Sequence, residues 1–401
     1  MTVTTAGPVD DARARANALR LAVASALAGA NASVVFATGA IVGSILAPDK
    51  AYATVPISLF VVGMALSTLP AGWIARRNGR RATFQLGSGL GVLGGLINAL
   101  AVWRGDFWLY CLGTALCGGY AAVAQSYRFA AADTASDAFK PRAVSWVMAG
   151  GVAAGFVGPQ LVQNTMNLWA PYLFAASYVG QAAVALLAMA VLSTVDIPPP
   201  AAADLRAGRP LRVIATTPRF LIAALCGVVS YALMNLVMTA APLAMKMCGH
   251  DVSDSNLAIQ WHIVAMYLPS FVTGRLISRW GAERIIVAGL ALIALSSIVG
   301  LAGITVAHFW TGLILLGVGW NFGFIGASAM VLTTHRPEER NKVQSFNDFL
   351  VFGTMAVGSF SSGQVLVAWG WDWVNWITFP PLALAFAVLA AAALRRRAAP
   401  I

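Results

Sequence analysis

The stretch GWIARRNGRR, from Gly72 to Arg81, carries four arginines and two glycines between two long apolar runs. A related stretch, GRLISRWGAER, occupies residues 274–284, roughly half a chain further on. A basic turn between apolar runs is typical of a short loop that joins two membrane-crossing helices. The two copies predict a chain of two related halves, with a basic hairpin at the same place in each.

The composition also indicates a membrane protein. Of 401 residues, 59% are hydrophobic and only 10% are charged, whereas soluble domains have about 25% charged residues. The net charge of +11 comes from short basic runs between apolar segments. That distribution is typical of cytoplasmic loops and does not indicate a nucleic-acid partner. The four cysteines have neither metal-site nor disulfide spacing, so we expect free thiols in the core.

Apolar segments long enough to cross a bilayer, which takes about 20 residues, recur along the chain. We expect twelve spans near residues 17–46, 52–75, 81–103, 107–133, 142–166, 170–194, 219–247, 254–279, 284–305, 308–333, 342–369 and 372–394. Residues 1–16 are expected to be a short polar tail, with no cleaved signal peptide. The Pro-rich stretch 196–218 is predicted to link an N-terminal bundle, residues 1–195, to a C-terminal bundle, residues 219–401.

The basic residues predict the orientation in the membrane. Most of the 26 lysines and arginines fall in segments on the same side as the N-terminus. Basic loops face the cytoplasm, so both termini are expected inside, in a multi-pass protein of the bacterial plasma (inner) membrane.

The basic loop resembles the signature of the major facilitator superfamily, Gly-x-x-x-Asp-Arg-x-Gly-Arg-Arg, found between the second and third helices of these transporters. The positions that match are Gly72, Arg77, Gly79, Arg80 and Arg81, and Arg76 stands where the family has aspartate. The resemblance implies an all-α fold of twelve transmembrane helices, arranged as two pseudo-symmetric six-helix bundles. It also implies movement of a small organic solute by alternating access, driven by an ion gradient or by diffusion alone.

The loop is expected to act as a cytoplasmic gate between the halves, although fixing the topology accounts for part of its charge. In the family, the loop aspartate faces the start of the eleventh helix. Here that aspartate is missing, but Asp348 lies about two turns inside the eleventh span. A charge within a span is costly and needs a partner. We therefore predict an exchanged ion pair, of Arg76 or Arg77 with Asp348.

The fourth span contains a second charged pair, Arg128 and Asp133. The family often has an arginine in this helix, linked in some members to proton transfer. Arg128 and Asp133 are therefore candidate coupling or relay residues. The structural alternative is that they pair with each other, or that Arg128 extends its guanidinium to the interface.

Polar and aromatic residues near mid-membrane are the candidate substrate ligands. The family lines its cavity with the first, fourth, seventh and tenth helices, and six candidates fall on these spans. They are Asn31, Tyr120, Gln125, Asn235, Trp320 and Asn321. His262, in the eighth span, is a seventh candidate that can bind substrate or titrate. Such groups suit a small, uncharged or aromatic solute, although hydrogen bonding between helices is an equally good explanation for each residue alone.

Other function classes find little support. The sequence has no phosphate-binding loop, no nucleophile–base arrangement and no metal-ligand cluster, so neither an enzyme nor a cofactor is expected. The expected partners are the solute and the lipid bilayer, and coupling to protons is left open. The chain is expected to be a monomer. The missing loop aspartate leaves one alternative, a membrane receptor or sensor that keeps the transporter fold without turnover.

Overall fold

The computed structural model describes residues 11–49, 52, 55–198 and 208–398, and within these ranges the secondary structure is helical. The helices are α1 (Asp11–Leu46), α2 (Val55–Arg104), α3 (Phe107–Gln125), α4 (Tyr127–Asp133), α5 (Lys140–Thr165), α6 (Ala175–Ser193), α7 (Leu211–Ala215), α8 (Pro218–Met247), α9 (Val252–Tyr267), α10 (Ser270–Trp280), α11 (Ala282–Ala302), α12 (Val306–Val331), a 3-10 helix (Pro337–Glu339), α13 (Arg340–Trp376) and α14 (Phe379–Ala398).

The two basic stretches make the same backbone turn. In α2 the chain reverses at Gly79, with φ 86° and ψ 165°. In the second copy Gly281 lies between α10 and α11 with φ 85° and ψ 151°. A positive φ of this kind strains any residue with a Cβ, which explains the glycine in each copy. The predicted pair of hairpins is confirmed.

The described residues contain nine helical stretches that are long and apolar enough to cross a membrane. Two of these stretches contain a reversal of the chain. The reversal at Gly79 divides α2 into two crossings, and the reversal at Gly370 separates the crossing made by most of α13 from the one made by its last residues together with α14. The short helices α9 and α10 follow one another and together make a further crossing. With these three additions the described residues make the twelve crossings that the sequence predicts.

One predicted boundary was wrong, and two predicted spans contain a break. The first span extends back to Asp11, whose carboxylate accepts the backbone N–H and the hydroxyl of Ser136 at 3.0 and 2.9 Å. The fourth span is divided into α3 and α4 at Ser126, whose hydroxyl bonds back to Val123. The eighth span is divided into α9 and α10 before Pro269, which has no N–H to continue the helix.

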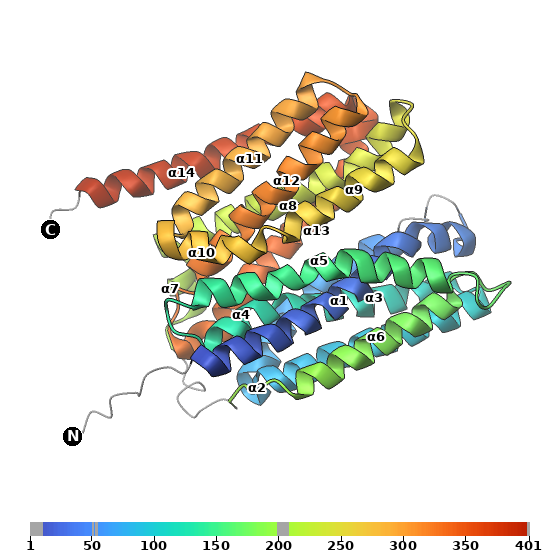
Figure 1. Cartoon of the computed structure of the whole chain (residues 1–401), viewed down its shortest axis with the longest axis horizontal. Coiled ribbons are helices and arrows are strands. Elements are labelled where there is room, and N and C mark those ends of the chain that lie inside the picture. Colours follow the sequence, from blue (N-terminus) through green and yellow to red (C-terminus); the bar gives the residue numbers. More distant parts are fainter. Residues whose placement is uncertain (1–10, 50–51, 53–54, 199–207, 399–401) are drawn as a thin grey trace.

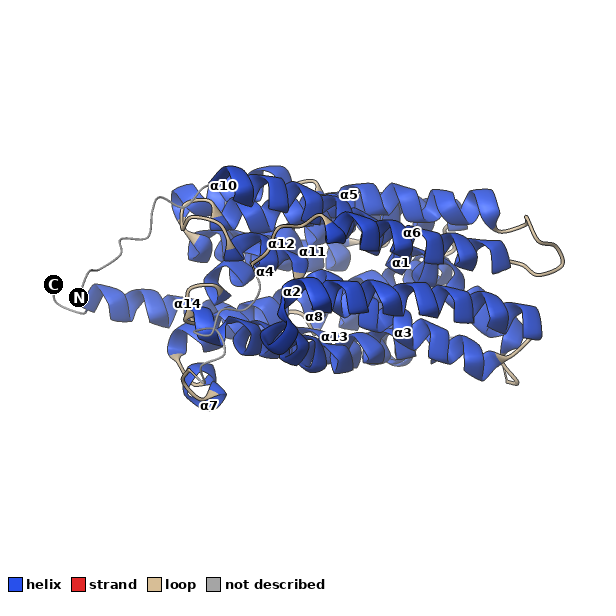
Figure 2. Cartoon of the chain, turned by 90° about the horizontal axis from the view of Figure 1, so that it is seen from below, coloured by secondary structure: helices blue, strands red, loops and turns tan. Residues whose placement is uncertain are grey.

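The helices form two bundles that lie side by side along the length of the molecule (Figure 1). The N-terminal bundle contains α1 to α6 and the C-terminal bundle contains α8 to α14. We call the end where α1 begins and α14 ends the terminal face. Seen from below, the long helices run between this face and the opposite end (Figure 2). The two bundles meet mainly through α2 against α13 and through α5 against α9 and α10.

A clasp near the terminal face holds the connection between the bundles. The carboxylate of Glu339 accepts hydrogen bonds from the backbone N–H and the guanidinium of Arg209, at 2.6–2.8 Å, and from the backbone N–H of Arg336 at 2.9 Å. These hydrogen bonds, those from Arg209 above all, lower the pKa of Glu339 from 4.5 to about 2. The same contact raises the pKa of Arg209. The predicted linker is therefore partly ordered, while its residues 199–207 lie outside the described part of the chain.

The clasp predicts a pH-dependent stability. Because the folded pKa of about 2 lies below the ordinary 4.5, the stabilisation is fully present above about pH 4.5 and is lost as the pH falls toward 2. Glu339→Gln is expected to lower the free energy of unfolding by about 1–3 kcal/mol at pH 7. Thermal unfolding in detergent should show a smaller difference in unfolding temperature between wild type and variant at pH 3 than at pH 7. An equal gap at both pH values, or the same effect from the neighbouring Glu338→Gln, would contradict this account.

Candidate functional site

The central contact between the bundles is a buried ion pair. Arg128 of α4 donates from Nη2 to Oδ1 of Asp348 in α13 at 2.6 Å, and both side chains are almost fully buried. Its Nε also donates to the hydroxyl of Ser328 in α12 at 3.2 Å. The guanidinium lies over the rings of Phe129 and Phe324, with its carbon 4.3 and 4.8 Å from their centroids. We call Arg128 and Asp348 the central ion pair.

A second network closes the bundles nearer the terminal face. Arg80, just after the Gly79 turn, donates from Nε to Asp133 at 3.0 Å, and both side chains are buried. Arg80 also donates to the side-chain oxygen of Gln344 in α13. Arg340 lies 3.8 Å from the Asp133 carboxylate and adds a second cation from the C-terminal bundle. We call these four residues the terminal network.

The predicted pairing of Asp348 with Arg76 or Arg77 was therefore wrong, and the alternative pairing of Arg128 with Asp133 is not formed either. Asp348 pairs with Arg128 instead of an arginine of the loop, and Asp133 pairs with Arg80 instead of Arg128. Each arginine pairs with the acid that packs beside it when the helices of the two bundles come together. The spacing of residues along the sequence does not reveal which side chains become neighbours in this way. In place of the loop aspartate of the family, the buried anion near Arg80 comes from Asp133 at the end of α4.

The remaining loop residues lie near the surface. Arg77 is exposed, and its guanidinium carbon lies 4.5 Å from the ring centroid of Trp73. Arg81 is exposed and Arg76 is partly exposed. These positions agree with a role in fixing topology, which was the alternative explanation for part of the charge.

Two glycines at matching positions bring the bundles into contact. A Cβ on Gly72 of α2 would meet the side chain of Ser345 and the carbonyl of Asn341, both in α13. A Cβ on Gly274 of α10 would meet the Arg142 backbone at 2.7 Å and other atoms of α5. The Ser145 hydroxyl of α5 reinforces this second crossing, because it donates to the Ser270 carbonyl at 2.6 Å and accepts from the Gly274 N–H at 2.9 Å.

Beside the central ion pair, aromatic rings fill the interior of the C-terminal bundle. Tyr231 of α8 packs edge-on against Trp320, Phe324 and Phe352, with centroids 5.0–5.5 Å apart. Trp320 stacks on Phe324 and meets Tyr267 of α9 edge-on at 5.6 Å. We call these five rings the aromatic cluster. Tyr267 is partly exposed, so one side of the cluster is accessible.

Three predicted ligands hold neighbouring helices together in this conformation. Asn31 donates to the Gln181 carbonyl of α6 at 3.2 Å and accepts from the Gln181 amide at 2.9 Å. His262 is fully buried, with Nδ1 2.7 Å from the Leu313 carbonyl of α12. Tyr120 is buried where its ring would meet a Cβ on Gly91 of α2. All three contacts are internal to one bundle.

The side chain of Asn321 forms hydrogen bonds on both sides of the break between α9 and α10. Its amide donates to the Met266 carbonyl and to the Ser270 hydroxyl, both at 2.6 Å, and its oxygen accepts from Thr273, also at 2.6 Å. Asn321→Leu is expected to cost about 1–3 kcal/mol of stability, because buried polar groups lose their partners. Ligand affinity should change by less than threefold. Thermal unfolding and ligand titration in detergent would check both, and a large loss of affinity at unchanged stability would make Asn321 a ligand instead.

The last three predicted ligands differ in exposure. Trp320 is completely buried, Asn235 retains 8% exposure, and Gln125 is partly exposed. Asn235 donates to the Met355 carbonyl at a long 3.5 Å, and Gln125 accepts from Arg128 at 3.3 Å. Asn235 is thus buried, whereas the partly exposed Gln125 touches the central ion pair directly.

Sequence reasoning missed Tyr231, Tyr267, Phe324 and Ser328. An aromatic residue or a serine in an apolar span is ordinary, so no local signal marks them. The only available signal was indirect, since the buried arginine in the fourth span had to find partners on other helices.

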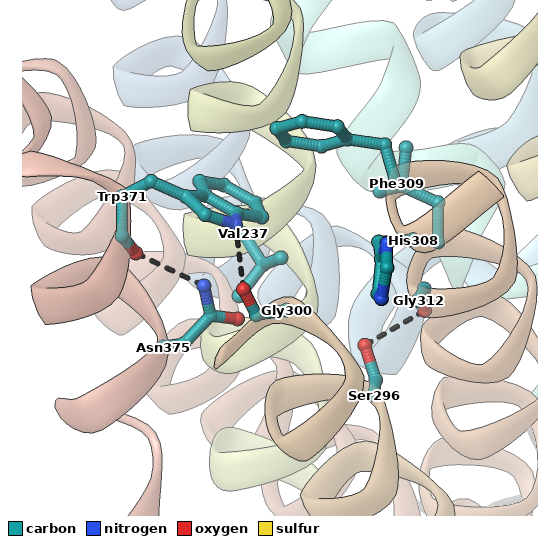
Figure 3. A pocket seen from close by; sticks show the side chains of 9 residues that line it. Val237, Ser296, Gly300, His308, Phe309, Gly312, Trp371 and Asn375 are labelled. Atoms are coloured by element: carbon teal, nitrogen blue, oxygen red, sulfur yellow. Dashed lines mark hydrogen bonds between the residues drawn. The ribbon is translucent and has the colours of Figure 1, made fainter. Parts of the chain in front are cut away.

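A small cavity in the C-terminal bundle is not a substrate site. It lies between α8, α11, α12 and α13, among Val237, Ser296, His308 and Asn375 (Figure 3). Its volume of about 10 Å³ is near the space that one water molecule needs. Figure 3 also shows the Trp371 indole N–H donating to the Gly300 carbonyl, at 3.1 Å, which closes one side.

Comparisons with known proteins agree with this architecture. The family model of the Major Facilitator Superfamily matches residues 21–259 and 223–401. The riboflavin transporter RfnT of Brucella anthropi is 48% identical over 380 residues, covering 94% of this chain and 95% of that protein. The uncharacterized MFS-type transporter YdeG of Bacillus subtilis is 29% identical over 364 residues, covering 86% and 84%.

Solved structures share the fold at low identity. The proton:xylose symporter XylE superposes with a TM-score of 0.77 at 12% identity, covering 94% of this chain and 95% of the other. The human organic anion transporter MFSD10 gives 0.75 at 14% identity, covering 94% and 99%. The resemblance seen in the basic loops is thus confirmed over nearly the whole chain. This chain belongs to the Major Facilitator Superfamily and is a multi-pass membrane transporter of a small organic solute, not an enzyme.

Proposed function

We propose that this protein transports riboflavin or a closely related flavin. The observation that carries the proposal is the 48% identity, over 94% of the chain, to a protein named as a riboflavin transporter. At that identity and coverage, the residues where the two bundles meet are expected to be largely shared.

The aromatic cluster supports this substrate. A flavin has a flat, largely apolar ring system that packs well against Tyr and Trp. Its carbonyls, its N–H and its hydroxylated chain need donors and acceptors, and Gln125, Asn235, Arg128 and Asp348 supply both. A flavin thus falls within the predicted class of small, uncharged or aromatic solutes.

The contacts between the bundles support a transport cycle of the following kind. The terminal face is cytoplasmic, because the basic loops gather there. The bundles of residues 1–195 and 219–401 rock about the interior site as a monomer, and the present conformation is closed at the cytoplasmic end. The loop glycines, Arg80 and the central ion pair form the gate. Asp133 and Asp348 are the acids available for proton coupling, and both lie in that gate.

Purified protein in liposomes provides the test. Wild type is expected to give saturable uptake of radiolabelled riboflavin that unlabelled riboflavin competes away, with a rate that depends on the pH gradient if protons are coupled. Flux no higher than in protein-free liposomes would overturn the proposal.

The same assay decides the alternative of a sensor without turnover, which would bind riboflavin but produce no flux. The feature that favoured a sensor was the missing loop aspartate. The terminal network now supplies an equivalent contact through Asp133, so that feature no longer favours it.

A further inference from the structure

The central ion pair lies beside an unfilled hydrogen-bond acceptor. The hydrogen bonds that described residues donate to Asp348 both end on Oδ1, from Arg128 at 2.6 Å and from the Asn347 amide at 3.2 Å. Oδ2 accepts neither of these two hydrogen bonds. The side-chain oxygen of Asn347 is also buried, and no described residue donates to it. An unfilled buried acceptor is costly. This unfilled acceptor lies beside Asp348, whose Oδ2 receives neither of these hydrogen bonds, and the two oxygens indicate a place for a ligand N–H or O–H group.

The aromatic cluster continues directly from this polar group. The Phe324 ring lies 4.8 Å from the guanidinium carbon of Arg128, and it stacks on Trp320 at 5.3 Å. The indole N–H of Trp320 is buried with no acceptor among the described residues. One buried surface thus combines flat rings, a cation, the unfilled acceptor of Asn347, the Oδ2 of Asp348 and the unfilled donor of Trp320.

We propose that this surface recognises the pyrimidine end of the flavin ring, an inference that rests on the proposed function. That end presents a carbonyl, the N3–H and a second carbonyl along one edge. Asp348 accepts the N3–H through Oδ2, and Arg128 donates to the adjacent carbonyl oxygen. Hydrogen bonds to charged groups are stronger than neutral ones, so these two contacts orient the ring. The aromatic cluster packs against the rest of the ring system.

The depth of the groups sets the direction of binding. Arg128 lies in the short α4 beside the terminal face, whereas Tyr231 and Trp320 lie in the middle of α8 and α12. A flavin that enters from the opposite end therefore leads with its polar edge. The dimethylbenzene end stays among the aromatic rings, and the ribityl chain lies near the amides of Gln125 and Asn235.

A purely structural ion pair would affect all ligands equally, which makes ligand discrimination the informative measurement. 3-Methylriboflavin lacks the N3–H but keeps the ring system and the ribityl chain. A site that hydrogen-bonds a substrate N–H rejects an analogue without it, so wild type should bind 3-methylriboflavin at least about 30-fold more weakly than riboflavin. Quenching of flavin fluorescence by the detergent-solubilised protein measures both affinities.

The variant Asp348→Ala is expected to reduce this discrimination to less than about threefold. Because it leaves Arg128 without its partner, the apolar pair Arg128→Met with Asp348→Leu serves as a second variant, since such replacements often keep a buried site folded. Asp133→Asn is the matched control. This substitution breaks the Arg80–Asp133 ion pair of the terminal network. It should leave the ratio of the affinities for riboflavin and 3-methylriboflavin as in wild type.

The outcomes separate the two proposals. Equal affinity of wild type for both flavins, or unchanged discrimination in a folded Arg128→Met/Asp348→Leu variant, would overturn the recognition of the pyrimidine edge while riboflavin transport stands. If wild type instead binds lumiflavin, which lacks the ribityl chain, more weakly and binds 3-methylriboflavin normally, the acceptors belong to the ribityl hydroxyls. That result would equally overturn recognition of the pyrimidine edge. Absence of riboflavin binding and flux in wild type would overturn the proposed function itself.

Discussion

Asp348→Ala is expected to reduce riboflavin flux in liposomes by at least about 100-fold, because it leaves the Arg128 guanidinium buried without its carboxylate. Removing one partner of a buried ion pair costs about 3–5 kcal/mol. The pair joins α4 to α13, and both side chains are almost fully buried in the closed conformation. The cost therefore falls on the conformation that is closed at the terminal face, and the cycle loses one of its two end states.

A charge exchange provides the control for this prediction. Arg128→Asp alone and Asp348→Arg alone should each abolish flux, because each places two like charges together inside the protein. The double exchange should recover at least about a tenth of wild-type flux, since one opposite-charge pair is restored. Flux of the double variant no better than that of either single variant would show that the pair does not hold the gate.

Gly72→Leu is expected to have the second largest effect. Any side chain at this position meets Ser345 and the backbone of Asn341 where α2 crosses α13. Forcing extra atoms into a packed contact costs about 1–3 kcal/mol, which shifts a population ratio by about 5–150-fold. Flux should fall accordingly, and reagents added at the terminal face should reach the interior more readily.

The matched control lies on α13 itself. A Cβ on Gly363 has nothing within 4 Å, so Gly363→Leu should retain most of the flux. Similar losses from both substitutions would mean that leucine disturbs helix packing in general. Gly274→Leu at the equivalent crossing with α5 should reproduce the effect of Gly72→Leu, because the two halves are built alike.

The fold was predictable because its determinants repeat along the sequence. Apolar length fixes the number of crossings, and the two basic loops reveal the two halves. The same loops contain Gly79 and Gly281, which have positive φ values. Such values are expected where a glycine lies in a tight turn. Helix breaks at Ser126 and Pro269 escaped prediction, since each lies within a run that remains apolar on both sides.

The site was less predictable, because partners in this fold come from different helices. The sequence identified Arg128, Asp133 and Asp348 as costly charges, but the partner predicted for Asp348 was a loop arginine, whereas the structure pairs it with Arg128. It placed Asn31 and Asn321 in the cavity because both lie on cavity-lining helices. Which side of such a helix a residue occupies depends on the packing, and both residues turn toward neighbours in their own bundle.

The central claim is that binding of a flavin opens one end of the protein as the other closes. Paired spin labels measure this directly, at Asp137 and Arg279 on the terminal face and at Asn164 and Leu257 near the opposite end, after replacement of the native cysteines. Riboflavin is predicted to populate longer distances for the first pair together with shorter distances for the second. Riboflavin that binds but leaves both distance distributions unchanged would contradict the account.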